Sequence, residues 1–458
     1  MSLIENLRAL VGEGGVLDAA ETAQRSAGVW RPDNLKAAAL VRPRSTEEVA
    51  AVLRYCHANC LKVVTQGGLT GLVHGSDAAP DEVIVSLELM RTIELIDPLQ
   101  RVAQVQAGVT LQALQEAADT HDLAFPLDLG ARGTATLGGN AATNAGGNRV
   151  IRYGMTRDMV LGIEAVLADG TVISSLNQLI KNNAGYDLKH LFIGSEGTLG
   201  VITRLVLRLR EKPTTTNMAF AAFESFARVP AFLKHMDRAL GGTLSAFEVM
   251  WQPTYRLFTG GHVGGKQPVA GDYPMYALVE SQGADRAMDT ERFNKAMESA
   301  FEAGLLADAA IAQSDADCHE FWSIRDNVEA VMTRGLPIIF DVSLPIAKME
   351  DYTARLGPAL TEAIGTHELF IFGHLGDGNL HLIVPAPPAQ YMAWRPKIEA
   401  VVYGGLEAFR GSVSAEHGIG LEKKPWLHIS RTPEEIALMR TLKQALDPKG
   451  MLNAGKVV

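Results

Sequence analysis

Two histidines flank a predicted turn in the C-terminal half of the chain. His374 and His381 lie in the stretch FIFGHLGDGNLHLIV, residues 370–384. Apolar, β-prone residues on both sides of its Asp-Gly pair predict a hairpin with a two-residue turn, in which His374 stands opposite His381. Opposed residues have Cβ atoms roughly 4.5–5.5 Å apart, so the two imidazoles can share a metal ion; a hairpin with two hydrogen-bonded histidines is the structural alternative. Asn379 lies two residues before His381 and should face the same side of the strand.

A third metal ligand is available in the segment SAEHGIG, residues 414–420. Its glycines allow the backbone to bend beside Glu416 and His417. With His374 and His381, Glu416 would complete a two-histidine, one-carboxylate set that keeps coordination positions open, as catalytic metals do. His417 would then remain as a base beside the ion. The alternative is a capped loop with a surface Glu-His pair.

Composition excludes several classes of protein. The chain has 458 residues, 47% hydrophobic and 21% charged, which is typical of a globular protein with two or three domains. The net charge of −10 and the lack of a basic run argue against nucleic-acid binding. The sequence contains no uncharged apolar stretch of about 18 residues, so a transmembrane segment is not expected. Only three cysteines and no apolar signal core predict a cytoplasmic protein.

Apolar periodicity and turn signals predict strands and helices along the whole chain. Strands are expected at residues 61–65, 83–87, 102–107, 160–168 and 201–208. Capping residues predict where two helices begin, at Ser45 and Thr110, and a helical pattern predicts a third helix from Thr432. The last of these helices should end at Leu446, before an Asp-Pro pair.

Three glycine-rich loops accompany the predicted strands of the first half, at residues 66–71, 138–147 and 194–200. Glycine lets backbone N–H groups point into a concavity and lets a pyrophosphate approach closely. No loop matches the Gly-x-Gly-x-x-Gly fingerprint, so a nicotinamide Rossmann site is not supported. Each loop alone has a purely structural alternative. Together, with their threonine and asparagine side chains, they suggest an extended phosphate-bearing cofactor.

These motifs carry a family resemblance. QGGLTG at 66–71, GGNAATNAGG at 138–147 and GSEGTLG at 194–200 resemble the FAD-binding domain of the vanillyl-alcohol-oxidase flavoprotein superfamily. The hairpin and SAEHG at 414–418 resemble the C-terminal half of its D-2-hydroxyacid dehydrogenases, above all the branches that act on D-2-hydroxyglutarate and D-lactate. The resemblance runs from about Pro43 to Lys456.

The resemblance implies an α+β fold in three parts. A PCMH-type FAD-binding domain of two subdomains would span residues 1–211. A cap (substrate) domain with an antiparallel sheet and the metal site would span residues 212–420. A helical C-terminal segment, 421–458, would pack on the FAD-binding domain.

The resemblance also implies how FAD is held. Some superfamily members tether FAD through a histidine after the paired glycines; this chain has Leu69 there, so FAD should be non-covalent. The first two loops would hold the pyrophosphate and line the flavin, residues 196–202 would contact the adenosine end, and Asn453 would return to the flavin. The expected cofactor-binding residues are Gly67, Gly68, Leu69, Thr70, Gly71, Gly138, Gly139, Asn140, Thr143, Asn144, Gly146, Gly147, Glu196, Gly197, Gly200, Ile202 and Asn453.

The implied reaction is oxidation of a small 2-hydroxy acid to the 2-oxo acid. The substrate would chelate a divalent ion, His417 would take the hydroxyl proton, and the hydride would move to flavin N5. Zinc is favoured, with manganese or ferrous iron as alternatives. Arg325 matches an arginine for the substrate carboxylate; a surface arginine paired with Asp326 or Glu329 is the alternative. Hydroxyglutarate-specific relatives carry a lysine where this chain has Ile339, which favours D-lactate or a longer apolar acid.

The expected catalytic residues are therefore His417, Arg325 and Asn379. Electrons would pass to a separate acceptor such as an electron-transfer flavoprotein, a quinone or a cytochrome, and a homodimer is the assembly considered. Two other functions compete: an oxygen-using alcohol or sugar oxidase of the same superfamily, and a non-catalytic flavin-binding subunit of a larger complex. Such a subunit should lack the metal ligands and the base, and this chain keeps all four residues.

Overall fold

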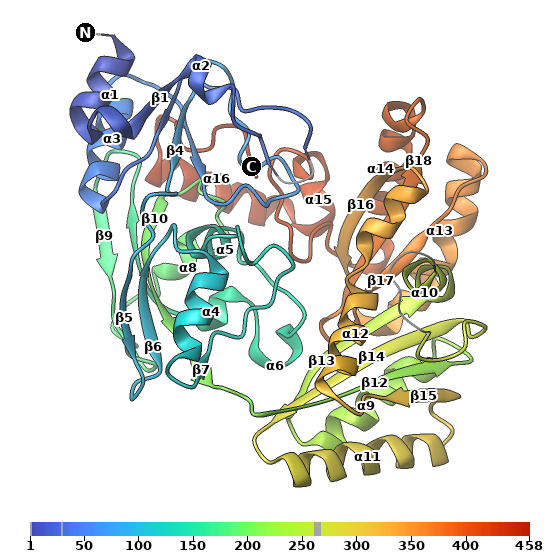
Figure 1. Cartoon of the computed structure of the whole chain (residues 1–458). Helices are drawn as coiled ribbons and strands as arrows, with labels where there is room; N and C mark the ends of the chain where they lie inside the picture. Colours follow the sequence, from blue (N-terminus) through green and yellow to red (C-terminus); the bar gives the residue numbers. More distant parts are fainter. Residues whose placement is uncertain (1, 29–30, 261–266) are drawn as a thin grey trace. The chain divides into compact units, whose positions relative to one another are not determined.

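The computed structural model describes residues 2–28, 31–260 and 267–458. The chain divides into two compact units (Figure 1). Unit 1 comprises residues 1–147, 154–212 and 416–458, and unit 2 comprises residues 148–153 and 213–415. Both units combine helices with sheets, which confirms the α+β class. Among the described residues, no helix has both the length and the apolarity to cross a membrane. The division into three functional domains stays a prediction.

The first sheet of unit 1 has four strands in the order β1-β2-β4-β3. They are β1 (Val16–Asp18), β2 (Ala39–Val41), β4 (Val83–Ser86) and β3 (Val63–Gln66). The last three run parallel, and β4 is buried along its length, as parallel strands usually are. Helix α3 (Thr46–Ala58) begins at Ser45, whose hydroxyl accepts a hydrogen bond from the Glu48 amide. The nearby helices are α1 (Leu3–Val11), α2 (Ala19–Thr22) and the 3-10 turn η1 (Glu13–Gly15).

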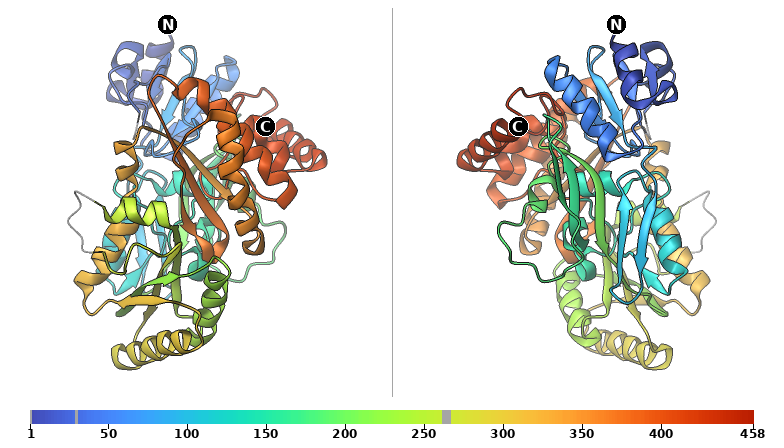
Figure 2. Two further views of the ribbon diagram at one scale, coloured as in Figure 1. Left: turned by 90° about the vertical axis from the view of Figure 1, so that its right-hand side faces the viewer. Right: turned by 90° about the vertical axis from the view of Figure 1, so that its left-hand side faces the viewer.

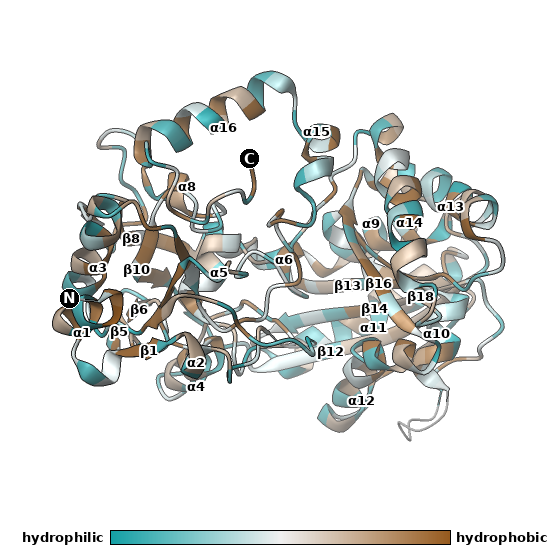
Figure 3. Ribbon diagram, turned by 90° about the horizontal axis from the view of Figure 1, so that it is seen from above, coloured by the Kyte–Doolittle hydropathy of each residue, from teal (hydrophilic) through white to brown (hydrophobic). Residues whose placement is uncertain are grey.

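The second sheet of unit 1 is antiparallel, in the order β5-β6-β10-β8-β9. Its strands are β5 (Ile93–Asp97), β6 (Val102–Gln106), β10 (Val201–Arg208), β8 (Val160–Val166) and β9 (Val172–Ser175). The strands β8 and β10 are coloured as hydrophobic in Figure 3 and are largely buried. All five strands expected in this half are therefore present. The other elements are α4 (Leu111–Asp119), α5 (Leu137–Thr143), α7 (Thr156–Met159), α8 (Lys189–Phe192), and β7 (Leu123–Ala124) paired with β11 (Arg210–Glu211).

The other two predicted helix starts are also confirmed. The Thr110 hydroxyl accepts a hydrogen bond from the third residue of α4. Thr432 and Glu435 form a reciprocal capping box at the start of α16 (Pro433–Leu446), which ends where expected. The short elements η6 (Lys424–Trp426) and α15 (Leu427–Ser430) precede it. After α16 the chain returns to β3, where the Asn453 amide donates to the Val63 carbonyl at 2.8 Å.

Unit 2 is built on one seven-stranded antiparallel sheet, in the order β15-β12-β14-β13-β17-β18-β16. Its strands are β12 (Thr215–Phe223), β13 (Leu244–Trp251), β14 (Met275–Gly283), β15 (Asp308–Ile311), β16 (Leu336–Ser343), β17 (Phe370–His374) and β18 (Asn379–Ala386). Its helices are α6 (Val150–Tyr153), α9 (Arg228–Leu240), α10 (Gln252–Thr259), α11 (Arg286–Glu302), α12 (Asp315–Arg325), α13 (Met349–Ile364) and α14 (Tyr391–Leu406). The 3-10 turns are η2 (Val328–Thr333), η3 (Ile346–Lys348), η4 (Leu375–Asp377) and η5 (Glu407–Phe409).

Helices cover both faces of this sheet. On one face, the Phe232 ring of α9 contacts Phe223 and Phe247, and α9 lies beside α11 (Figure 2). On the other face, α10 and α12 join the strands in one aromatic core, in which Phe220 contacts both helices. This second face also carries polar residues of the candidate site, because Glu248, His374 and His381 lie two residues from Met250, Phe372 and Ile383 of this core on the same strands.

Candidate active site and metal centre

The histidine hairpin forms, but the predicted register and two-residue turn are wrong. His381 pairs with Phe372, two residues before His374, because η4 occupies the connection between β17 and β18. Gly373 permits this path, since a Cβ there would lie 2.4 Å from the carbonyl oxygen of Asn379. A shift of two residues preserves strand alternation, so His374 and His381 remain on the same face, with ring centroids 5.2 Å apart.

A carboxylate from the neighbouring strand holds His374. Glu248 of β13 pairs directly with His374 of β17, and its Oε1 lies 2.6 Å from His374 Nδ1. Both side chains are buried. Burial raises the pKa of Glu248, but its interactions with His374 and Arg325 outweigh burial and lower that pKa to about 2. Glu248 is therefore a carboxylate at neutral pH and accepts hydrogen bonds from both neighbours.

Arg325, at the end of α12, is buried beside this pair. Its Nε donates to Glu248 Oε2 at 2.9 Å, and its Nη2 lies 3.3 Å from His374 Nε2. Its guanidinium lies over the Phe372 ring, 5.3 Å from the centroid. The alternative of a surface arginine is wrong, because Arg325 is only 7% exposed, although Nη1 does contact Asp326 at 3.3 Å.

The described residues offer two groups that could hold a metal ion, and His381 belongs to both. One is the predicted set His374, His381 and Glu416; the other is Asp341, His381 and His417. In each group the ligand atoms lie within 4.8 Å of one another. Asp341 pairs with His381 across β16 and β18, and its Oδ2 accepts from the amide of Ala415, the residue directly before Glu416.

Asn379 is the clearest sign that this face takes a ligand. It lies two residues before His381 on β18 and is only 3% exposed. Neither its Oδ1 nor its Nδ2 has a hydrogen-bond partner among the described residues. A buried polar group without a partner costs about 1–3 kcal/mol, so a bound polar molecule is the expected partner.

The three glycine loops come together in unit 1. The Gly194 amide donates to Ala141 and the Glu196 amide to Ala142, at 3.0 and 2.8 Å, which ties the third loop to the second. The first loop follows β3 and packs against the residues that precede α5. The packing is so close at Gly68 that a Cβ there would lie 1.8 Å from the Thr134 carbonyl oxygen. The second loop holds Gly138, Gly139, Asn140 and Thr143 on α5, then Asn144, Gly146 and Gly147 after it.

Asn453 joins this cluster from the C-terminal segment. Its Oδ1 accepts from the Thr65 amide at 2.9 Å, and its Nδ2 donates to the Glu196 carbonyl at 2.5 Å. The Glu196 carboxylate accepts from the amides of Ile419 and Gly420, and burial raises its pKa. Asn140 Nδ2 is buried and has no partner among the described residues, a donor that the polar atoms of a bound cofactor would satisfy. These loops therefore fit FAD.

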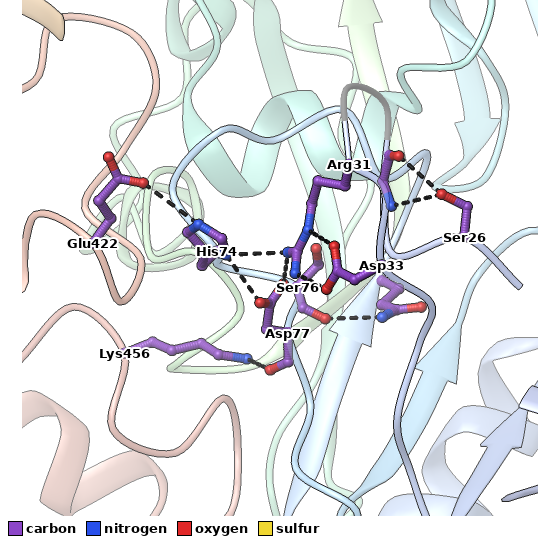
Figure 4. A network of polar contacts seen from close by, with 10 residues as sticks. Ser26, Arg31, Asp33, His74, Ser76, Asp77, Glu422 and Lys456 are labelled. Carbon is purple, nitrogen blue, oxygen red and sulfur yellow. Dashed lines mark hydrogen bonds and ion pairs between the residues drawn. The ribbon is translucent and has the colours of Figure 1, made fainter. Parts of the chain in front are cut away.

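A polar network anchors the C-terminal segment that carries Asn453 (Figure 4). Lys456 Nζ donates to the Asp77 carbonyl at 2.7 Å, and burial lowers the pKa of Lys456 to about 8. Arg31 pairs with Asp77, and the His74 ring lies 3.7 Å from the Glu422 carboxylate. No sequence pattern predicted this network, because its members are scattered over the whole of unit 1.

Family models cover both halves of the chain. The FAD binding domain model matches residues 37–175, and the model described as FAD linked oxidases, C-terminal domain, matches residues 212–457. The chain belongs to the FAD-linked oxidase family. As such it is an FAD-binding oxidoreductase of the PCMH type, which confirms the resemblance seen in the glycine motifs.

Relatives and solved structures agree with this assignment. This FAD-linked oxidase is 43% identical to the mitochondrial D-2-hydroxyglutarate dehydrogenase of Bos taurus, over 92% of this chain and 76% of the relative. It is 37% identical to a putative mitochondrial D-lactate dehydrogenase of Schizosaccharomyces pombe, over 91% of this chain and 81% of the relative. The solved structure of p-cresol methylhydroxylase shares the fold, with a TM-score of 0.78 at 17% identity, covering 98% of this chain and 95% of that one.

Sequence reasoning missed two carboxylates of the site, Glu248 and Asp341. Each is a single acid inside an apolar strand, in LSAFEVMW and LPIIFDVS. A lone acid in such a strand is rarely buried without a partner, so this pattern could have indicated a buried carboxylate with a charged or hydrogen-bonding partner.

Proposed function

We propose that this FAD-linked oxidase is a metal-dependent dehydrogenase of D-2-hydroxy acids. The observation that carries the proposal is the buried Asn379 with no partner among the described residues. It lies on the sheet face that also carries His374 and His381, and helix α12 places Arg325 beside His374. An amide, a guanidinium and two imidazoles are suited to a small acid that carries a hydroxyl beside a carboxylate.

Each residue would have a distinct task. His374, His381 and Glu416 would hold a divalent cation, zinc or alternatively manganese or ferrous iron, which lowers the pKa of a bound hydroxyl. An imidazole nitrogen of His417 would accept the hydroxyl proton. Arg325 would bind the substrate carboxylate, and Asn379 would bind a substrate oxygen. The glycine loops and Asn453 would hold FAD, which supplies the acceptor for the C2 hydride.

The test is an anaerobic titration of the FAD-loaded protein with D- and L-2-hydroxy acids, followed by flavin absorbance. We expect D-2-hydroxyglutarate or D-lactate to bleach the flavin and the L-acids to leave it oxidised. Chelator treatment should stop bleaching while FAD stays bound, and added Zn²⁺ or Mn²⁺ should restore it. Absence of bleaching by any 2-hydroxy acid would favour the non-catalytic flavin subunit, and rapid reoxidation by oxygen would favour the oxidase. The separate acceptor, the homodimer and the cytoplasmic location stay predictions.

Ile339 provides a test of substrate choice. It is 36% exposed and lies two residues before Asp341 on β16, so it faces the same side as His381. An Ile339→Lys change would place an ammonium group there. We expect the ratio of kcat/KM for D-2-hydroxyglutarate to that for D-lactate to rise roughly tenfold, the value of one charge-assisted hydrogen bond. Leu336→Lys is the matched control, because Leu336 is exposed on the opposite face of the same strand. An equal change in both variants would contradict the prediction.

A further inference from the structure

We propose that Glu248 is a positioning residue that aligns a metal ligand with one of its oxygens and the substrate-binding arginine with the other. This inference rests on the proposed function, because it assigns Glu248 a task in the same site. It extends that function by linking metal affinity to carboxylate recognition through one buried side chain.

The first oxygen selects the form of His374. With Oε1 2.6 Å from Nδ1, the ring donates its Nδ1 hydrogen to Glu248 and carries its lone pair on Nε2, where a bound cation would replace the 3.3 Å contact with Arg325 Nη2. Metal-binding histidines usually have such a partner, which fixes the ring and raises the basicity of the ligand. Glu248 and His374 are directly paired on adjacent strands, so the register of the sheet places the two side chains next to each other.

The second oxygen holds Arg325. Glu248 Oε2 accepts a hydrogen bond from Arg325 Nε at 2.9 Å. The same guanidinium directs Nη2 toward His374 Nε2, 3.3 Å away. The guanidinium carbon also lies over the Phe372 ring. The arginine fork is thereby fixed beside the ring nitrogen that would bind the ion. A substrate that chelates the ion would then present its carboxylate to a guanidinium already in place.

A second buried glutamate in the same sheet offers a matched control. Glu280 on β14 is 1% exposed, like Glu248, and accepts from Arg149, Ser245 and Trp322 at 2.9, 2.7 and 3.0 Å. Trp322 belongs to α12, the helix that carries Arg325. Glu280 therefore reproduces the burial, the arginine partner and the anchoring of α12, and it contacts none of the proposed metal ligands among the described residues.

The experiment compares Glu248→Gln with Glu280→Gln in the FAD-loaded protein. A carboxamide has one acceptor oxygen, so the new side chain in Glu248→Gln could accept from only one of the two donors and would turn an N–H toward the other. We expect the Zn²⁺ dissociation constant, measured by competition with a chromophoric chelator, to rise about 10–100-fold in Glu248→Gln. The visible spectrum of the Co²⁺-substituted protein should shift, and KM for D-2-hydroxyglutarate should rise. Glu280→Gln should keep the wild-type Zn²⁺ affinity and spectrum, even where its thermal stability falls.

Two results would overturn the inference. One is Glu248→Gln protein with wild-type Zn²⁺ affinity and an unchanged Co²⁺ spectrum; the other is an equal loss of affinity in Glu280→Gln. A wild-type protein that binds neither ion would instead contradict the proposed function, and the inference with it. Should Glu248→Gln fail to fold, Glu248→Asp replaces it, because a side chain one methylene shorter loses reach to one donor while keeping its charge. Wild-type Zn²⁺ affinity in that variant would equally overturn the inference.

Discussion

Replacing His417 with alanine should leave FAD bound but abolish the bleaching of the flavin by substrate. A positioned general base contributes roughly 10²–10⁴-fold to such a proton transfer. The measurement is anaerobic stopped-flow absorbance, with the FAD content determined on the same sample. Added imidazole should restore part of the rate, a response that a merely structural histidine would not give. Full-rate bleaching in His417→Ala would falsify the assignment of the base.

The structure adds a second interpretation of His417 that the same experiment resolves. His417 also falls within 4.8 Å of ligand atoms of Asp341 and His381 and could itself be a ligand. If it is the base, His417→Ala keeps its metal; if it is a ligand, metal is lost together with bleaching. Metal content by mass spectrometry separates the two. His428→Ala is the control, because His428 is an exposed histidine of the same stretch of unit 1, residues 416–458.

Replacing His381 with alanine should remove the metal whichever ligand set is used, because both sets contain His381. Loss of a direct ligand should weaken metal binding by more than the roughly 10–100-fold that loss of a supporting partner costs. The FAD content should not change, since the glycine loops lie in other segments of the chain. We expect purified His381→Ala to hold little metal and to show no bleaching at ordinary substrate concentrations.

His367→Ala is the matched control for this variant, since among the described residues its ring contacts only the nearby Gly365 carbonyl. It should keep both metal and turnover. Retention of stoichiometric metal by His381→Ala would place the ion elsewhere, and a loss of FAD in the same variant would show that the change disturbs more than the metal.

The capping residues show what local sequence could predict. Ser45, Thr110 and Thr432 begin their helices as expected, because an N-cap hydrogen bond joins residues three apart and its signal is contained in one short stretch. The glycine motifs likewise led to the FAD-linked oxidase family, since close backbone approach requires glycine at fixed positions. Their detailed roles in binding FAD stay predictions.

The hairpin shows where local reasoning stopped. Its strands and their shared face were predictable from alternation, but the register depended on η4 and on the close approach of Gly373 to the opposite strand. Two-residue turns and short 3-10 connections have similar local sequences. The choice between them depends on how the flanking strands pair with β13 and β16, which no short window contains.

Residue types and their spacing were enough to predict the kinds of chemistry available: glycine loops for a dinucleotide, two histidines and a Glu-His pair for a cation, and an arginine for an acid. The folded chain was needed to show that Arg325 is buried. It was also needed to show that Glu248, 126 residues from His374, accepts hydrogen bonds from both Arg325 and His374. The difference arises because side-chain identity and local hydrogen bonding act over a few residues, whereas burial and the pairing of distant strands depend on the whole sheet.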